Sequence, residues 1–171
     1  TALPAVDGER FTTGATHDCY TGKPTGITDV HGNPASIAYD DILDRPTSVT
    51  QGPAETQYFY SDLKSWLAVT TRKKQDNAGA QWLAATEAFD GLGRRTKSAT
   101  GEGTMAIEVE RRYDGLDRVR QVSAAAPSSL AKVWTTTGYD TLNRVTSITH
   151  PDGSVTTNSY AGNLVTTTDE A

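Results

Sequence analysis

Short stretches of alternating apolar and polar residues, separated by turn-forming residues, run along most of the chain. Residues 144–149 read Arg-Val-Thr-Ser-Ile-Thr, and residues 155–160 read Val-Thr-Thr-Asn-Ser-Tyr. Between them stands Pro151-Asp152-Gly153-Ser154, in which Asp-Gly favours a tight turn. Alternation with a period of two, bounded by Gly, Asp and Pro, is typical of strands joined in hairpins. Pro127 stops the short alanine run before it, and no convincing helix is predicted.

One pattern recurs along the chain: an aromatic residue, Asp, a few turn residues, Arg, and then an alternating stretch. The clearest copies are Phe89–Ser98, Tyr113–Val122 and Tyr139–Ile148. A fourth copy, Tyr39–Val49, carries one extra residue before its Arg, which a longer turn or a bulge would require. Weaker copies begin at Tyr20, Tyr60 and Tyr160, and successive copies start 19 to 29 residues apart. This spacing fits two strands plus two turns, so each copy is interpreted as one hairpin of variable length.

The unit Tyr-Asp-x-x-Gly-Arg, followed by a strand and a Pro-Asp-Gly turn, resembles the YD repeat of RHS proteins, Tc-toxin components and teneurins. The Phe89 copy is closest, with Phe in place of Tyr. In the next two copies Asp117 and Asn143 replace the second Gly, and both tolerate a left-handed backbone better than other non-Gly residues. The resemblance extends over roughly residues 20–171.

The resemblance implies an all-β fold of tandem antiparallel β-hairpin (YD) repeats, forming a curved, twisted strip that is part of a larger hollow shell. Such shells enclose or present a toxin or other cargo domain. We expect one array over 1–171 with a partial leading unit at 1–19 and no linker, and we expect the chain to be a fragment. The Asp-Pro motifs of the family's self-cleaving core region are missing, so no self-cleavage is predicted.

The acidic residues of the repeat might suggest acid/base chemistry, but each belongs to its own turn. We therefore predict that each Asp caps its turn and pairs with the Arg that ends it, in place of catalysis or metal binding. The residues assigned to the repeat motif are Tyr39, Asp40, Arg45, Phe89, Asp90, Gly91, Gly93, Arg94, Tyr113, Asp114, Gly115, Arg118, Tyr139, Asp140, Arg144, Pro151, Asp152 and Gly153.

The composition adds that the core must be thin. Leu, Val, Ile and Phe together supply 29 of 171 residues, while 27 are Thr, a strand-favouring residue. Aromatic rings would supply part of the missing core. For Trp66, Trp82 and Trp134 we prefer packing, with contact to a ligand or cargo as the alternative. The alternative function is accordingly a carbohydrate- or protein-binding β-repeat module that uses an aromatic face.

Charge and the reactive residues narrow the expected partners. The formal net charge is -5, which offers no electrostatic reason to bind nucleic acid. No apolar stretch is long enough to span a bilayer. His17, His31, His150 and Cys19 are isolated, so we predict no metal, no cofactor and no enzymatic activity. The expected partners are the remainder of the parent polypeptide and an enclosed cargo, with glycans as the alternative and exposed strand edges that favour self-association. No signal peptide is recognised, and the family resemblance implies a secreted or cell-surface location.

Overall fold

The computed structural model of the chain describes residues 12–63, 66–74 and 81–170. These residues hold fifteen β-strands and one 3-10 helix, η1. In chain order they are β1 (Gly14–His17), β2 (Pro24–Thr28), β3 (Pro34–Ala38), β4 (Ser48–Gln51), β5 (Ala54–Leu63), β6 (Trp66–Lys74), β7 (Trp82–Phe89), β8 (Arg95–Thr100), η1 (Gly103–Met105), β9 (Ile107–Tyr113), β10 (Val119–Ser123), β11 (Ala126–Pro127), β12 (Trp134–Tyr139), β13 (Val145–Thr149), β14 (Val155–Ala161) and β15 (Leu164–Glu170).

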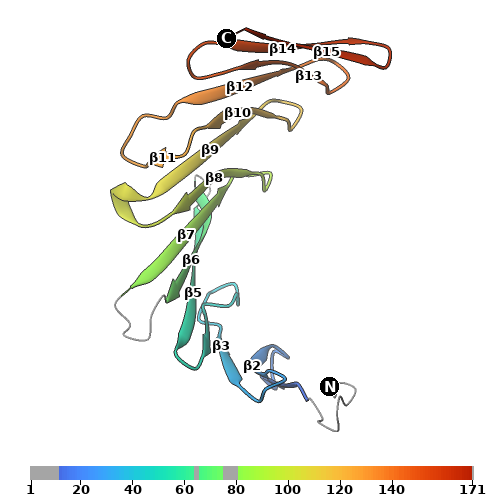
Figure 1. Cartoon of the computed structure of the whole chain (residues 1–171). Coiled ribbons are helices and arrows are strands. Elements are labelled where there is room, and N and C mark those ends of the chain that lie inside the picture. Colours follow the sequence, from blue (N-terminus) through green and yellow to red (C-terminus); the bar gives the residue numbers. More distant parts are fainter. Residues whose placement is uncertain (1–11, 64–65, 75–80, 171) are drawn as a thin grey trace. The chain divides into compact units, whose positions relative to one another are not determined.

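The strands form a meander in which each pairs with its neighbours in sequence (Figure 1). One strand departs from this path: β11 lies beside β9, while β10 pairs directly with β12. The pairings are antiparallel, as in β3 with β4 and β14 with β15. The predicted all-β class, built from tandem antiparallel hairpins, is therefore confirmed.

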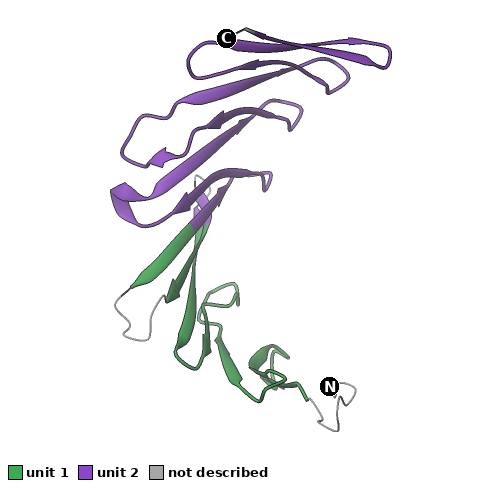
Figure 2. Cartoon of the chain, viewed as in Figure 1, with its two compact units in different colours: residues 1–61, 69–85 green, residues 62–68, 86–171 purple. Residues whose placement is uncertain are grey.

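The chain divides into two compact units (Figure 2). Unit 1 comprises Thr1–Ser61 and Val69–Ala85, and unit 2 comprises Asp62–Ala68 and Thr86–Ala171. In unit 1, β1 to β4 follow one another as successive hairpin strands. In unit 2, the same arrangement holds from β8 to β15, apart from β11. Each unit is thus built from the same kind of hairpin.

The strand register slips by one residue next to three of the turns. Tyr139 pairs with Val145 and Gly138 with Ser147, which leaves Thr146 as an extra residue. Equivalent slips occur on the return strands β2 and β10, where Thr25 and Arg120 are the extra residues. A β-bulge bends its strand and increases the local twist. The bulges were not predicted. In two copies the apolar residues after Arg stand three positions apart, as in Val145 and Ile148, which interrupts the alternation and was the available signal.

The buried core of the described residues is small, as the composition predicts. Its apolar members are four alanines, Ala68, Ala84, Ala88 and Ala106. Among the described residues no large side chain is fully buried, and sixteen large apolar side chains are exposed. The fold is therefore held mainly by backbone pairing and by side chains that are half-buried on a sheet surface.

One buried charge cluster lies within unit 2 and was not predicted. Glu108 on β9 is only 8% exposed, and its carboxylate meets the Lys97 ammonium at 3.2 Å and the Lys132 ammonium at 3.3 Å. Lys132 also donates to the carbonyl of Pro127 at 3.1 Å. A buried carboxylate needs such partners, and here they fasten the connection between β10 and β12 to the sheet.

Candidate functional site in the turn ladder

Four turns share an Asp–Arg spacing of four and a left-handed third residue after Asp, and we call them the motif turns: residues 41–45, 90–94, 114–118 and 140–144. In the turn at Asp90, one carboxylate oxygen accepts the backbone N–H groups of Leu92 and Arg94, both at 3.0 Å. The other oxygen accepts the Arg94 Nε–H at 2.7 Å. The same three bonds hold the turns at Asp114 and Asp140. Each carboxylate therefore closes its own turn and fixes the arginine that ends it.

The backbone of a motif turn is left-handed at the third residue after Asp. The φ angle is 59° at Asp44, 78° at Gly93, 63° at Asp117 and 66° at Asn143. Glycine adopts this region freely, and Asp and Asn are the side-chain-bearing residues that enter it most readily. The second-Gly position of the repeat therefore needs a particular backbone, which explains the substitutes found there.

Gly91 and Gly115, directly after Asp, have a different status. Neither shows a positive φ, and a Cβ added to either would meet nothing within 4 Å. Thr141 occupies the same place in the turn at Asp140. The glycines at this position are therefore not required by the turn geometry.

The turn after Tyr39 corrects the prediction that Asp40 pairs with Arg45. The paired residue is Asp41, whose carboxylate accepts Arg45 Nε–H at 2.7 Å and Nη2–H at 3.0 Å. The spacing of four between Asp and Arg is the same as in the other motif turns, so the extra residue of this copy is Asp40, before the turn. The backbone N–H of Asp40 donates to the Thr47 hydroxyl at 3.2 Å, which ties this residue to the return side of the hairpin.

An arginine of one motif turn lies over the aromatic ring of the next copy. The distance from the guanidinium carbon to the ring centre is 4.7 Å for Arg94 and Tyr113, and 4.6 Å for Arg118 and Tyr139. Arg45 over Tyr60, Arg144 over Tyr160 and the Lys23 ammonium over Tyr39 repeat the arrangement at 4.0, 4.2 and 5.2 Å. A cation within about 6 Å of a ring face is attracted by the ring.

The same tyrosines bond back to the preceding copy. The Tyr139 hydroxyl donates to the carbonyl of Val119 at 2.8 Å, which is the residue directly after Arg118. Four further hydroxyls do the same one residue after a cation: Tyr39 to Pro24, Tyr60 to Pro46, Tyr113 to Arg95 and Tyr160 to Val145. Phe89 has no hydroxyl and makes no such bond. We call this chain of Asp, cation and aromatic residue the turn ladder.

The electrostatics of the ladder keep its acids ionised. The Arg45 guanidinium, bonded to Asp41, lowers the pKa of that carboxyl from its usual 3.8 to about 2. Burial by itself would raise the pKa of Asp90, but bonds from the backbone and side chain of Arg94 outweigh it and lower the pKa. The pKa of Asp140 is lowered first by the Arg144 backbone N–H. A lowered carboxyl pKa suits a charge that holds structure, whereas a general acid needs a raised one.

At the opposite ends of the strands the predicted Pro151-Asp152-Gly153 turn joins β13 to β14. The Asp152 carboxylate accepts the Ser154 N–H at 2.9 Å and its hydroxyl at 2.7 Å, and Gly153 has a φ of 91°. Asp29 closes the turn between β2 and β3 in a related way, through the backbone and side-chain amides of Asn33. These turns carry no arginine, so they lack the ladder.

The first turn of the described residues belongs to the ladder but begins at a different residue from the one that the sequence pattern predicts. It begins at Asp18, whose carboxylate accepts the backbone N–H groups of Tyr20 and Thr21 at 3.0 and 2.7 Å. Tyr20, where a weak copy was expected to begin, lies inside this turn and is 94% exposed. Lys23 takes the place of the arginine. Asp18 precedes Lys23 by five residues, one more than the spacing of the motif turns, so only a looser Asp–cation spacing could have located this turn.

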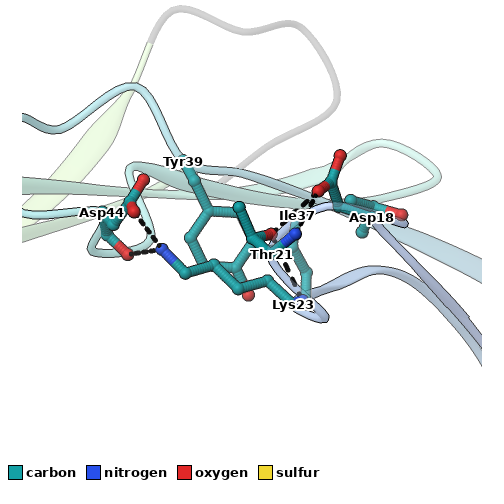
Figure 3. Close-up of a pocket in the computed structure, with 7 residues that line it drawn as sticks. Asp18, Thr21, Lys23, Ile37, Tyr39 and Asp44 are labelled. Atoms are coloured by element: carbon teal, nitrogen blue, oxygen red, sulfur yellow. Dashed lines mark hydrogen bonds and ion pairs between the residues drawn. The ribbon is translucent and has the colours of Figure 1, made fainter.

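A hollow of about 270 Å³ beside this turn is lined by Asp18, Thr21, Lys23, Thr25, Ile37, Tyr39 and Asp44. Figure 3 shows Lys23 extending past the Tyr39 ring to Asp44. The Lys23 ammonium meets the Asp44 carboxylate at 2.9 Å and the Asp44 carbonyl at 2.8 Å. Lys23 and Asp44 are therefore paired with each other, and Asp18 is bonded within its own turn.

The tryptophans predicted as candidate contact residues have separate surroundings. Trp82 and Trp134 are half-buried, with the Arg72 guanidinium 5.5 Å from the Trp82 ring centre and that of Arg112 4.1 Å from the Trp134 ring centre. The side chain of Trp66 lies outside the described residues. Arginine therefore already covers one face of each described tryptophan ring.

Histidine, cysteine and carboxylate side chains do not assemble elsewhere in the described part of the chain. No group of three or more of them lies close enough to hold a metal ion in residues 12–63, 66–74 and 81–170. Cys19 is exposed. Within the same ranges, none of the helices is long and apolar enough to cross a membrane.

Comparison with known proteins relates this geometry to a family. Residues 139–171 match the RHS Repeat family. The chain is similar in structure to the crystal structure of TcdB2-TccC3, with a TM-score of 0.67 and 15% sequence identity over 94% of this chain. It spans 11% of the length of that chain. None of the curated proteins matches it in sequence. The structural likeness, at this identity, shows a shared fold.

Proposed function

We propose that this chain is a stretch of a YD/RHS-type repeat array and forms part of a shell wall that encloses or presents another protein domain. The observation that carries the proposal is the turn ladder, because its side chains bond one hairpin to the next. Arg118, for example, bonds Asp114 in its own turn and lies over Tyr139 of the following copy. Such residues are well placed to build an extended wall and poorly placed to bind a small substrate.

The surface of the hairpins supports the same role. Sixteen large apolar side chains are exposed among the described residues, and four of them stand at the same place in the motif turns: Leu43, Leu92, Leu116 and Leu142. Covering exposed apolar side chains with neighbouring protein is favourable, because it removes apolar surface from water. We infer that the rest of the parent polypeptide, and an enclosed toxin or other cargo domain, are the partners of this stretch, in a secreted or cell-surface protein.

No observation favours the alternative, a carbohydrate-binding module. The arginines over Trp82 and Trp134 occupy one face of each half-buried ring and leave only the opposite face for stacking on a sugar. The ladder carboxylates have lowered pKa values, which does not suit acid catalysis, so the proposed role is structural.

Limited proteolysis of the full-length protein that contains these repeats tests the wall. We expect a segment outside the repeats to resist protease in the wild type and to be cleaved faster in Tyr139→Ala, which removes one rung of the ladder. Tyr20→Ala, at an exposed ring in a turn, is the matched control and should leave the resistance unchanged. Equal cleavage of every segment outside the repeats in all three proteins would reject enclosure.

A glycan array distinguishes the alternative. The wall proposal predicts no glycan binding by the 171-residue chain. Binding that disappears in Trp134→Ala would establish the carbohydrate-binding module in its place.

A further inference from the structure

We propose that the residue three places after the Asp of a motif turn is a pairing residue, which recognises the cation of the preceding turn. The pairing residues are Asp44, Asp117 and Asn143. They would determine which hairpin can follow which in the array. This pairing is a property of neighbouring hairpins and stands whether or not the array encloses a cargo.

Each of the three side chains accepts a bond from the turn before it. Lys23 donates to Asp44, with the ammonium 2.9 Å from the carboxylate (Figure 3). The Arg94 guanidinium forms an ion pair with Asp117, and Arg118 Nη1–H donates to the Asn143 side-chain oxygen at 2.9 Å. The contacts join residues that lie 21 to 25 positions apart in the chain.

The backbone at the three pairing residues favours glycine over a residue with a side chain. All three residues have φ between 59° and 66°, a region that costs free energy for any residue with a Cβ and costs glycine nothing. The family pattern has glycine here. A side chain at this position therefore calls for a compensating interaction, and in each case the preceding cation supplies one.

The fourth motif turn shows the reverse combination. It has Gly93 at the third place. Asp62 of the preceding copy lies within β5, and Trp66, four residues later, begins β6. Glycine thus stands where the preceding copy has no arginine at the motif spacing.

Arg144 gives a second comparison, because the turn that follows it has no third place. Ala161 pairs directly with Leu164, which leaves a connection of two residues. The Arg144 side chain is 41% exposed, against 26% for Arg94 and 20% for Arg118. Within unit 2, the two arginines whose next turn carries a pairing residue, Arg94 and Arg118, are therefore covered more fully than Arg144.

A double-mutant cycle in the 171-residue chain tests the pairing of Arg94 with Asp117. The four proteins are the wild type, Arg94→Gln, Asp117→Gly and the double variant. The measurements are urea unfolding by circular dichroism and hydrogen exchange of the Leu116 amide, which lies in the same turn as Asp117. Because the pair is exposed, we expect a coupling of about two- to five-fold in the unfolding equilibrium constant, reduced in roughly 1 M salt.

The competing explanation is that Asp and Asn are merely tolerated in a left-handed turn. In that case Asp117→Gly has the same effect in the wild-type background as in the Arg94→Gln background, the coupling is absent, and the proposal is overturned. If Asp117→Gly does not fold, Asp117→Asn replaces it in the cycle. Asparagine keeps an acceptor oxygen but carries no charge. The coupling between positions 94 and 117 must then persist in part and no longer depend on salt.

A second cycle contains its own matched control. Asn143→Gly should couple to Arg118→Gln, the preceding cation, and not to Arg144→Gln, the cation of its own turn. Because Asn143 is uncharged, Asn143→Gly leaves the net charge near both arginines unchanged. Equal coupling to both arginines, or to neither, would contradict the pairing of consecutive turns.

Discussion

The turns of unit 1 and unit 2 differ in sequence more than in their connections to the next hairpin. In unit 2 the motif turns at Asp90, Asp114 and Asp140 have the same hydrogen bonds and the same spacing. In unit 1 the turn at Asp18 is one residue longer and uses Thr21 where the others use arginine. The cation of either kind of turn nevertheless lies over the next tyrosine, and that tyrosine bonds back. The cation–tyrosine contact between consecutive hairpins is therefore present in both units, although the hydrogen bonds that close the turn differ.

The largest expected effect is the loss of a ladder tyrosine, which tests whether the link matters equally in both units. Tyr139→Ala removes a half-buried ring, its contact with the Arg118 guanidinium and the bond to Val119, so we expect a loss of about 2–3 kcal/mol in unfolding free energy. Tyr39→Ala in unit 1 should lose a similar amount. Urea unfolding followed by circular dichroism measures both. Tyr20→Ala, at a ring that is 94% exposed, should change stability by less than about 0.5 kcal/mol. A small loss at Tyr39 alone would break the equivalence of the units.

The next effect concerns the backbone of a single motif turn in unit 2. Gly93 has a φ of 78°, so Gly93→Ala should destabilise by about 1–2 kcal/mol. Gly91, two residues earlier, is free of that constraint, and Gly91→Ala should be neutral or should stabilise by up to about 1 kcal/mol. Thermal unfolding measures the stability of the two variants. Equal losses of stability would show that the left-handed backbone at Gly93 does not require glycine.

Residue spacing explains how much of this site was predictable. The copies at Phe89, Tyr113 and Tyr139 indicate hairpins because aromatic, Asp and Arg recur at fixed intervals. Asp40 fits the sequence pattern because it follows the aromatic directly, although the distance of four to Arg45 favours Asp41. The pattern begins each copy at an aromatic residue and so predicts a copy at Tyr20, whereas the turn begins at Asp18.

Other features have no local signal at all. An arginine over the tyrosine of the next copy depends on how consecutive hairpins stack, and the spacing between copies varies. The Glu108–Lys132 contact joins a residue on β9 to one on a long connection, and neither residue stands out among the other charges. Only the folded register brings such groups together.

Exchanging lysine and arginine sharpens the comparison of the units. Arg118 bonds Asp114 through Nε and Asn143 through Nη1, and an ammonium on a flexible stem cannot reproduce that fork. We expect Arg118→Lys to cost about 1 kcal/mol. Lys23 has no arginine-type bond to Asp18 to lose, so Lys23→Arg should stay within about 0.5 kcal/mol of the wild type. Comparable losses for the two exchanges, measured by urea unfolding, would show that one cation geometry serves both units.

Acid titration gives the smallest effect, and it separates Asp41 from the rest of the charged surface. Arg45 holds the pKa of Asp41 at about 2, against 3.8 ordinarily. Because the folded-state pKa is the lower one, the unfolded chain takes up a proton first as the pH falls. The stability that Asp41 contributes is therefore complete above about pH 4 and is lost between about pH 4 and about pH 2. Asp41→Asn should flatten this part of the pH dependence of unfolding. A pH dependence that is unchanged in Asp41→Asn would contradict the pairing of Asp41 with Arg45 and remove the common spacing on which the comparison of the two units rests.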